Sequence, residues 1–205
     1  MKDESGALLP VLEKLFDGPA DSKLTLSEFL SGLEGRSYAF AIAALDLPNV
    51  IPTGIPWLST VTGVPMLILL GQFLLGRPVP SLPDFIGRRG LARGKLQSFL
   101  TRARPHILRI QRATHPRRRW WVSGTARTAL FVTGALQVLL LALPVPFDNL
   151  LPAWAILFFC LALIESDGVM AILGWISTFL TVLWTIFLVF AGFAVFSRLF
   201  TLLGF

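Results

Sequence analysis

The sequence predicts an all-α integral membrane protein with two proline-broken helical hairpins, interpreted as re-entrant and as an internal repeat, plus amphipathic interfacial helices. Three observations lead to this prediction. Hydrophobic residues make up 54% of the 205 residues and charged residues only 15%, whereas a soluble domain carries about a quarter charged residues. The apolar residues form long blocks without basic residues. Each of the two main blocks is broken by a proline-rich segment that contains Asn-x-x-Pro.

The two breaks share a composition as well as a motif. Asn49–Pro52 lies within residues 47–56, and Asn149–Pro152 lies within residues 143–152. Proline lacks the backbone N–H that continues a helix, so we expect a helix interruption at both breaks. Inside lipid, interrupted backbone is tolerated only where protein or a water-filled cavity satisfies it. Paired interruptions in two halves of a chain therefore indicate a site within the membrane.

The chain divides into four segments by composition. Listed in order, these are an N-terminal amphipathic arm (1–36), a first membrane hairpin (37–76), a basic interfacial segment (77–121), and a second hairpin with a C-terminal membrane helix (122–205).

The N-terminal arm predicts two short helices. In the first, apolar residues from Leu8 to Phe16 recur at helical spacing. The second begins with Thr25 or Ser27 as its N-cap and has Glu28 in its first turn. These helices either lie on the membrane surface or cover the hairpins.

The hairpin arms are short for full membrane spans. The first hairpin has arms at about 38–47 and 64–75, whereas a full span needs about 20 residues. Its second arm extends back to Trp57 if Thr60 and Thr62 bond to their own helix, and both interpretations stay open. The second hairpin has arms at about 128–143 and 153–164. We favour re-entrant hairpins with their prolines inside the membrane.

The final apolar block runs from 168 to about 196 without a charged residue. It is longer than one perpendicular span requires. It is interpreted either as one tilted helix or as a span that continues along the membrane interface.

The segment between the hairpins is strongly basic. Residues 77–119 contain twelve of the eighteen Lys and Arg residues and one acid, Asp84, so the positive-inside rule places the segment in the cytoplasm. Apolar residues from Leu96 to Ile110 follow helical spacing, which predicts an interfacial helix, bent or broken near Pro105. We expect anionic phospholipid as its partner and no nucleic acid. The expected lipid-surface residues are Arg102, Arg109, Arg112, Arg117, Arg118, Arg119, Trp120 and Trp121.

Several stretches resemble one family of bacterial membrane proteins. They are Pro48–Pro56, the run Gln72–Arg77 followed by Leu82-Pro83, Pro146–Pro152 and Leu163–Gly168. On these residues the chain is similar to the ExoD (exopolysaccharide synthesis) family. The resemblance implies a multi-pass protein of the bacterial inner membrane that is linked to exopolysaccharide production, and it implies no established reaction. The paired broken helices are also similar in architecture to those of the DedA lipid transporters, which is an analogy of fold alone.

Carboxylates within apolar blocks mark the expected site, because the bilayer makes them costly. Asp46 precedes Pro48 in a short apolar arm. Asp167 has a structural alternative as the cap of the last helix, Glu165 as a solvated turn residue and Asp148 as a turn brace. Gln72 is expected to bond to a neighbouring helix. The expected substrate or proton pathway comprises Asp46, Asn49, Pro52, Gln72, Asp148, Asn149, Pro152 and Glu165.

Two classes of function follow. The first is a transporter or flippase of an anionic lipid or lipid-linked sugar, in which the asparagines bind the headgroup and Asp46 or Glu165 relays protons. The alternative is a non-transporting accessory or regulatory partner of the exopolysaccharide machinery, which docks through its basic segment. Enzyme activity, a metal and a cofactor are not expected, because the chain shows no nucleophile set, ligand spacing or phosphate loop. A homodimer is left open.

Overall fold

Four helices form a closed bundle at the centre of the molecule. The computed structural model describes residues 8–51, 57–114, 118–142 and 149–202. The bundle contains α3 (Ser37–Val50), α4 (Leu58–Leu74), α7 (Gly124–Ala142) and α8 (Leu150–Glu165). Each helix packs on two others, in the cyclic order α3, α4, α7, α8 and back to α3. The predicted helical fold class is therefore confirmed.

The interior of this bundle is apolar and so is much of its exterior. Buried side chains from all four helices meet in one core, among them Ile42, Met66, Val138 and Ile156. The outer faces of α4 and α7 expose apolar residues such as Ile68 and Leu139. A helix with apolar residues on both faces is typical of a lipid environment.

Two helices are long and apolar enough to cross a membrane. They are α7 and the first part of α9 (Gly168–Leu202), over residues Gly168–Phe193. No more than a third of the apolar stretch of each is buried in the structure, whereas the core helix of a soluble protein is mostly buried. Together with the exposed apolar faces of the bundle, these helices indicate a membrane protein.

The prolines interrupt the helices less than expected. α3 continues through Pro48 to Val50, and α4 begins at Leu58, so the expected interruption lies within residues 47–56 but after Pro48. A proline in the last turn removes one helix hydrogen bond, which a helix end tolerates better than a helix centre does. Pro152 lies in the first turn of α8, where the missing N–H would have no partner within the helix.

The long form of α4 is the correct one. This helix begins at Leu58 and continues through Pro65 to Leu74, which includes the polar stretch that the shorter interpretation left out. Helical structure in both hairpins therefore extends further towards the breaks than the apolar arms indicate.

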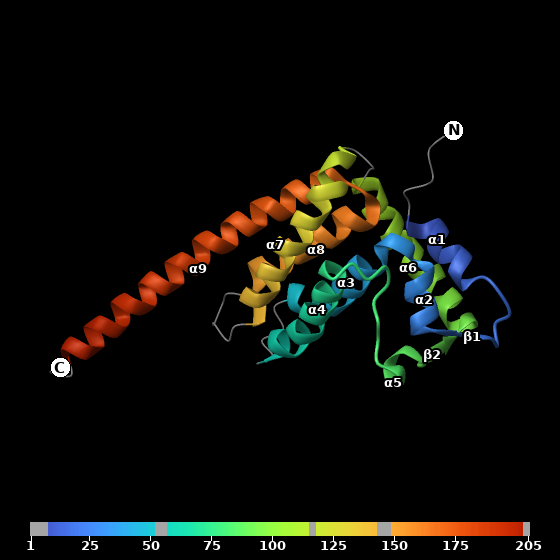
Figure 1. Cartoon of the computed structure of the whole chain (residues 1–205), viewed down its shortest axis with the longest axis horizontal. Helices are drawn as coiled ribbons and strands as arrows, with labels where there is room; N and C mark the ends of the chain where they lie inside the picture. Colours follow the sequence, from blue (N-terminus) through green and yellow to red (C-terminus); the bar gives the residue numbers. More distant parts are fainter. Residues whose placement is uncertain (1–7, 52–56, 115–117, 143–148, 203–205) are drawn as a thin grey trace.

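The N-terminal arm and the basic segment fold together into a cap at one end of the bundle (Figure 1). The cap consists of α1 (Leu8–Phe16), β1 (Lys23–Thr25), α2 (Leu26–Gly32), α5 (Asp84–Gly87), β2 (Gly90–Ala92) and α6 (Arg93–Ala113). Strands β1 and β2 pair antiparallel and join the two segments, with Leu24 opposite Leu91. The sequence did not indicate this pairing, because each strand has only three residues.

Local signals fix the start of α2 as predicted. Thr25 is the N-cap, and it forms a capping box with Glu28. The hydrogen bond from the Thr25 backbone N–H lowers the pKa of Glu28 below its usual value. A short 3-10 helix (Glu34–Arg36) then leads directly into α3, so the cap is joined to the bundle without a linker.

The prediction of an interfacial helix at 96–110 needs correction. The side chains of Leu96, Leu100 and Ile107 pack in the core of the cap, so protein covers most of the face that was assigned to lipid. Phe99 stays outside this core with 65% of its surface exposed. α6 also continues through Pro105 as one helix, so the expected break there is wrong.

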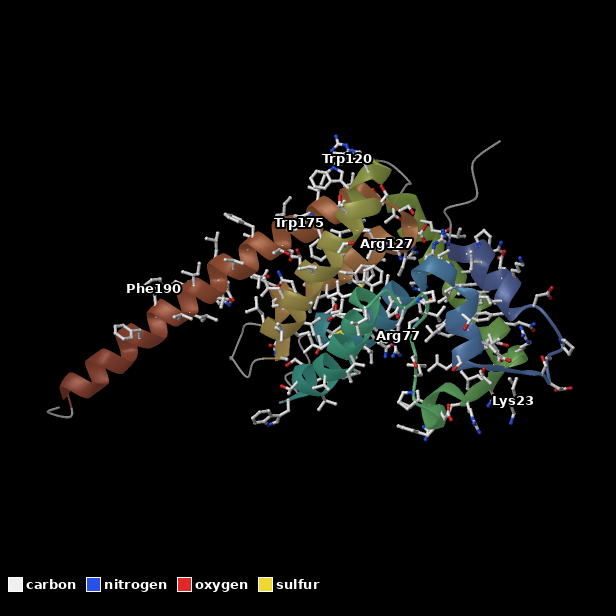
Figure 2. The ribbon with its side chains drawn as sticks, in the orientation of Figure 1. Lys23, Arg77, Trp120, Arg127, Trp175 and Phe190 are labelled. Carbon is white, nitrogen blue, oxygen red and sulfur yellow. The ribbon has the colours of Figure 1, made fainter. Side chains whose placement is uncertain are left out.

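α9 is a single helix, as one of the two interpretations held. The Asp167 Oδ1 atom accepts a hydrogen bond from Val169 N at 2.8 Å, which confirms the predicted cap. The first half of α9 packs along α8, and Ser177 Oγ donates to Leu151 O at 3.1 Å. Beyond this level α9 extends alone past the bundle, and its exposed Phe190 is labelled in Figure 2.

We expect the packing of α8 against α9 to depend on Gly174. A Cβ atom at this position would overlap the Phe159 ring, whereas a Cβ at Gly192 of the same helix would meet nothing within 4 Å. Gly174→Ala should therefore be less stable than the matched variant Gly192→Ala by about 1–3 kcal/mol. Thermal unfolding of both purified variants in detergent measures this difference. Equal melting temperatures would contradict the described packing.

Candidate functional site

The ends of the two hairpins meet on the first turns of α4. The Asn49 Nδ2 atom donates to Thr62 Oγ1 at 2.9 Å, and the Asn149 Nδ2 atom donates to Ser59 Oγ at 3.2 Å. Ser59 and Thr62 are neighbours on one helix face, because three residues make almost one turn. Two asparagines that are 100 positions apart in the sequence therefore donate hydrogen bonds to the same part of α4.

Threonines complete this polar group. Thr62 Oγ1 bonds to Leu58 O of its own helix at 3.0 Å, as predicted, whereas Thr60 Oγ1 donates across to Ala142 O at the end of α7 at 3.1 Å. The latter bond satisfies a carbonyl that the helix itself leaves free. We call Asn49, Ser59, Thr60, Thr62 and Asn149 the apex cluster.

The two Asn-x-x-Pro motifs occupy different places in their helices. Asn49 lies in the last turn of α3, whereas Asn149 directly precedes α8 and makes no side-chain cap to it. Pro52 and Asp148 lie outside the described residues. The cyclic order of the four helices is the order that a twofold repeat of hairpins would give, and the internal repeat itself stays a prediction.

Asp46 lies inside the bundle, one turn before Asn49. Its side chain has an exposed fraction of 0%, and in the described part of the chain neither carboxylate oxygen has a hydrogen-bond partner. The amide of the nearby Asn49 bonds to Thr62 instead. The thiol of Cys160 on α8 lies within electrostatic range of this carboxylate.

Gln137 on α7 is a second buried polar side chain that the sequence analysis missed. It is fully buried, and neither of its amide atoms has a hydrogen-bond partner among the described residues; the same holds for the Asn149 Oδ1 atom. The available signal was one amide within a long apolar helix. The charges and the Asn-x-x-Pro motifs of the apolar blocks do not point to it.

Two of the predicted pathway residues lie at the other end of the bundle. The Glu165 Oε1 atom accepts a hydrogen bond from Leu8 N at 3.4 Å, so Glu165 joins α8 to the cap. α8 rises about 22 Å from Leu150 to Glu165, which separates Glu165 from the apex cluster. Gln72 bonds to both backbone groups of Ser81 in the loop after α4, at 2.7 and 3.0 Å. The expectation that Gln72 bonds to a neighbouring helix is therefore wrong.

Basic side chains gather at the cap end of the bundle. Figure 2 shows Arg77 and Arg127 there, and Arg127 lies over the Phe73 ring at 5.4 Å and donates to Gly35 O. No Lys or Arg occurs in 37–76 or 128–197. The apex cluster therefore lies in surroundings without cations from these hairpin segments.

The expected lipid-surface residues are mostly exposed where they are described. Arg102, Arg109 and Arg118 point into solvent, and Trp120 stacks beside Trp121 with ring centroids 4.4 Å apart. Trp121, in the short helix η3 (Arg119–Val122), packs against the same apolar cluster as Trp175 of α9. Arg117 lies outside the described residues, as do the side chains of Arg112 and Arg119. Contact with lipid stays a prediction for all of them.

The chemistry of the apex cluster is that of neutral donors and acceptors beside one acid. Among the described residues, no three His, Cys, Asp or Glu side chains lie close enough to hold a metal ion. Amide and hydroxyl groups bind hydroxyl-rich ligands through directional hydrogen bonds. The side chains of the cluster are therefore of the type that hydrogen-bonds polar groups, and Asp46 places an acid beside them.

Comparison with known proteins assigns the family. A family model described as "Exopolysaccharide synthesis, ExoD" matches residues 8–187. The chain belongs to the ExoD family. This result confirms the resemblance seen in the sequence and associates the protein with exopolysaccharide synthesis.

Two relatives show how far the similarity extends. Protein ExoD of Rhizobium meliloti (strain 1021) is 28% identical over 200 residues, which cover 95% of this chain and 81% of the relative. An uncharacterized protein of Synechocystis sp. is 25% identical over 154 residues, which cover 75% of this chain and 73% of the relative. No solved structure matches the chain.

We expect a measurable coupling between Asn49 and Thr62. A double-mutant cycle with Asn49→Leu and Thr62→Val should give an interaction free energy of about 0.6–1.7 kcal/mol, the range for hydrogen bonds between membrane helices. The unfolding free energies of the four proteins in one detergent provide the cycle. Asn49→Leu combined with Thr128→Val, at an exposed position of α7, is the control and should show no coupling. A coupling free energy of zero for Asn49 and Thr62 would contradict a stabilising hydrogen bond between them.

Proposed function

We propose that this ExoD-family protein moves a lipid-linked sugar across or within the inner membrane during exopolysaccharide synthesis, with the apex cluster as its binding site. The observation that carries the proposal is a set of buried polar groups without protein partners at the hairpin ends. Asp46, Gln137 and Asn149 Oδ1 are buried in an apolar bundle and unbonded in the part of the chain that the structure describes. Such groups are costly unless a ligand or solvent bonds to them.

The depth of the site supports this proposal. Ser177 of α9 lies beside Leu151 in the first turn of α8, to which it is hydrogen-bonded. Along α9, Ser177 is about 14 Å from the start of the helix at Gly168. Its apolar stretch continues to Phe193, a further rise of about 24 Å. If α9 spans the bilayer, the hairpin ends lie within the hydrocarbon region, where re-entrant backbone can border a substrate site.

The type of side chain favours the sugar portion of a lipid over its phosphate. Phosphate sites use Lys, Arg or several backbone N–H groups, and the two hairpin segments contain no Lys or Arg near their ends. Asparagine amides and threonine hydroxyls match sugar hydroxyls as both donors and acceptors. In this proposal Asn49 and Asn149 hold the sugar, and Asp46 accepts and releases the coupled proton.

Orientation follows from the charges. The cap contains most of the basic residues. Arg77 and Arg127 lie at the same end of the bundle (Figure 2), and Arg36 directly precedes α3. The positive-inside rule then places the cap in the cytoplasm, so that the hairpins enter the membrane from that side. Of the two acids expected to relay protons, only Asp46 lies at the site, and we assign Glu165 to the joint with the cap.

Removing the charge of Asp46 tests the proposal. Asp46→Asn keeps the volume and hydrogen-bonding capacity of the side chain but cannot titrate. We expect this variant to lose at least about tenfold of the exopolysaccharide output that the wild-type gene restores to a deletion strain, a typical loss when a proton-transfer group is removed. Asp84→Asn, at an exposed acid of α5 that pairs with Arg88, is the matched control and should complement fully.

Membrane levels of each variant, measured by immunoblot, separate lost function from lost protein. If Asp46→Asn complements fully, proton-coupled transport through this site is excluded. A variant in which Gln replaces Arg117, Arg118 and Arg119 tests the alternative function. If this variant fails to complement while Asp46→Asn complements, a docking partner of the exopolysaccharide machinery would be favoured.

A further inference from the structure

The cap contains an apolar groove that is separate from the apex cluster. It has a volume of about 670 Å³, within the range of roughly 300–1,000 Å³ that is typical of small-molecule sites. Its floor includes Leu12, Phe16, Leu24 and Leu100, all buried. Its rim includes Leu91 and Phe99, which are exposed by 56% and 65%.

Few polar groups line this groove. Arg89 is its one charged lining residue among those described, and Thr25 is already occupied by the capping box with Glu28. An apolar groove of this kind favours an apolar occupant. The lining therefore suits a hydrocarbon chain better than a sugar or a nucleotide.

The position of the groove and its charges indicate where that chain comes from. Phe40, in the first turn of α3, also lines it, so the groove is continuous with the helix that enters the membrane. Arg88 and Lys95 are exposed and directly precede the lining residues Arg89 and Leu96 in the sequence. Arg89, at the rim, has no ion pair among the described residues, whereas its neighbour Arg88 pairs with Asp84 at 3.3 Å. A lipid with an acyl tail and an anionic headgroup matches this pattern.

We propose that the groove binds an acyl chain of an anionic phospholipid from the adjoining membrane leaflet, with the headgroup phosphate on Arg89. This proposal does not depend on transport through the apex cluster. It gives the basic segment a specific function in lipid binding, while the apolar residues of α6 pack in the cap.

Photocrosslinking of the full-length protein in membranes tests the proposal. The probe is phosphatidylglycerol with a diazirine at the end of one acyl chain, and mass spectrometry locates the labelled residues. A chain inside the groove should label its floor, at Leu12, Phe16 or Leu100. Labels confined to Leu91 and Phe99 would show contact with the membrane surface only and would overturn the proposal, as would labels confined to the membrane helices.

Two pairs of neighbouring residues provide matched variants. Ile86 lines the groove, whereas exposed Phe85 does not. Ile86→Trp should lower floor labelling about fivefold or more, because loss of contact with even one or two methylenes reduces affinity about fourfold to fifteenfold. Phe85→Trp should leave the labelling unchanged. Arg89→Gln should lower labelling by phosphatidylglycerol more than Arg88→Gln does.

Controls keep the result independent of folding and of another occupant. The melting temperature of each variant shows that the cap stays folded, and a diazirine phosphatidylcholine probe reports the contribution of headgroup charge. If Ile86→Trp keeps its melting temperature and its floor labelling, the groove does not hold the chain. If floor labelling by the lipid probe occurs only in preparations without a copurifying protein, the groove binds that protein instead.

Discussion

The hydrogen bonds from Asn49 and Asn149 to α4 hold the two hairpins together at the end where their backbones are interrupted. Helices end in free N–H and C=O groups, and lipid offers no partners for them. The bond from Thr60 to the Ala142 carbonyl meets part of this demand at the end of α7. In the proposed re-entrant arrangement the rest of the bundle depends on this constraint, because hairpins that end inside a membrane must satisfy each other's free backbone groups.

The same lack of partners in lipid applies to the side chains of Asp46 and Gln137. Both are buried in the bundle, yet the described residues provide no hydrogen bonds to them, while the neighbouring polar side chains are largely paired. A membrane protein that kept such groups without a use would lose stability. Their position beside the apex cluster is the physical reason to connect the site with a polar substrate and with proton exchange.

Composition and motif spacing predicted the membrane class, the helical hairpins and the family. Local signals were also reliable where they act within a few residues, as at the Thr25 cap and the Asp167 cap. Long-range pairing was the main source of error. Helical spacing shows that α6 has an apolar face but does not show whether lipid or α1 covers it, and Gln72 could not be assigned to Ser81 from its neighbours in the chain. The first apolar arm was expected to end at about Leu47, because proline disfavours a helix, whereas α3 continues to Val50 before the chain is interrupted.

The depth of the hairpin ends within the bilayer is the central claim, and a single cysteine measures it most directly. Ile51, at the end of α3, is 64% exposed in the structure, and Ile51→Cys in a Cys160→Ala background carries one thiol at the hairpin end. Membrane-impermeant maleimide should fail to label it from either side, while a fluorophore at this position should be quenched most by lipids with nitroxides midway along the acyl chain. Labelling from the periplasmic side would show that the first hairpin crosses the membrane fully, and labelling from the cytoplasm would show that it lies outside the bilayer. Either result would contradict a site at mid-membrane depth.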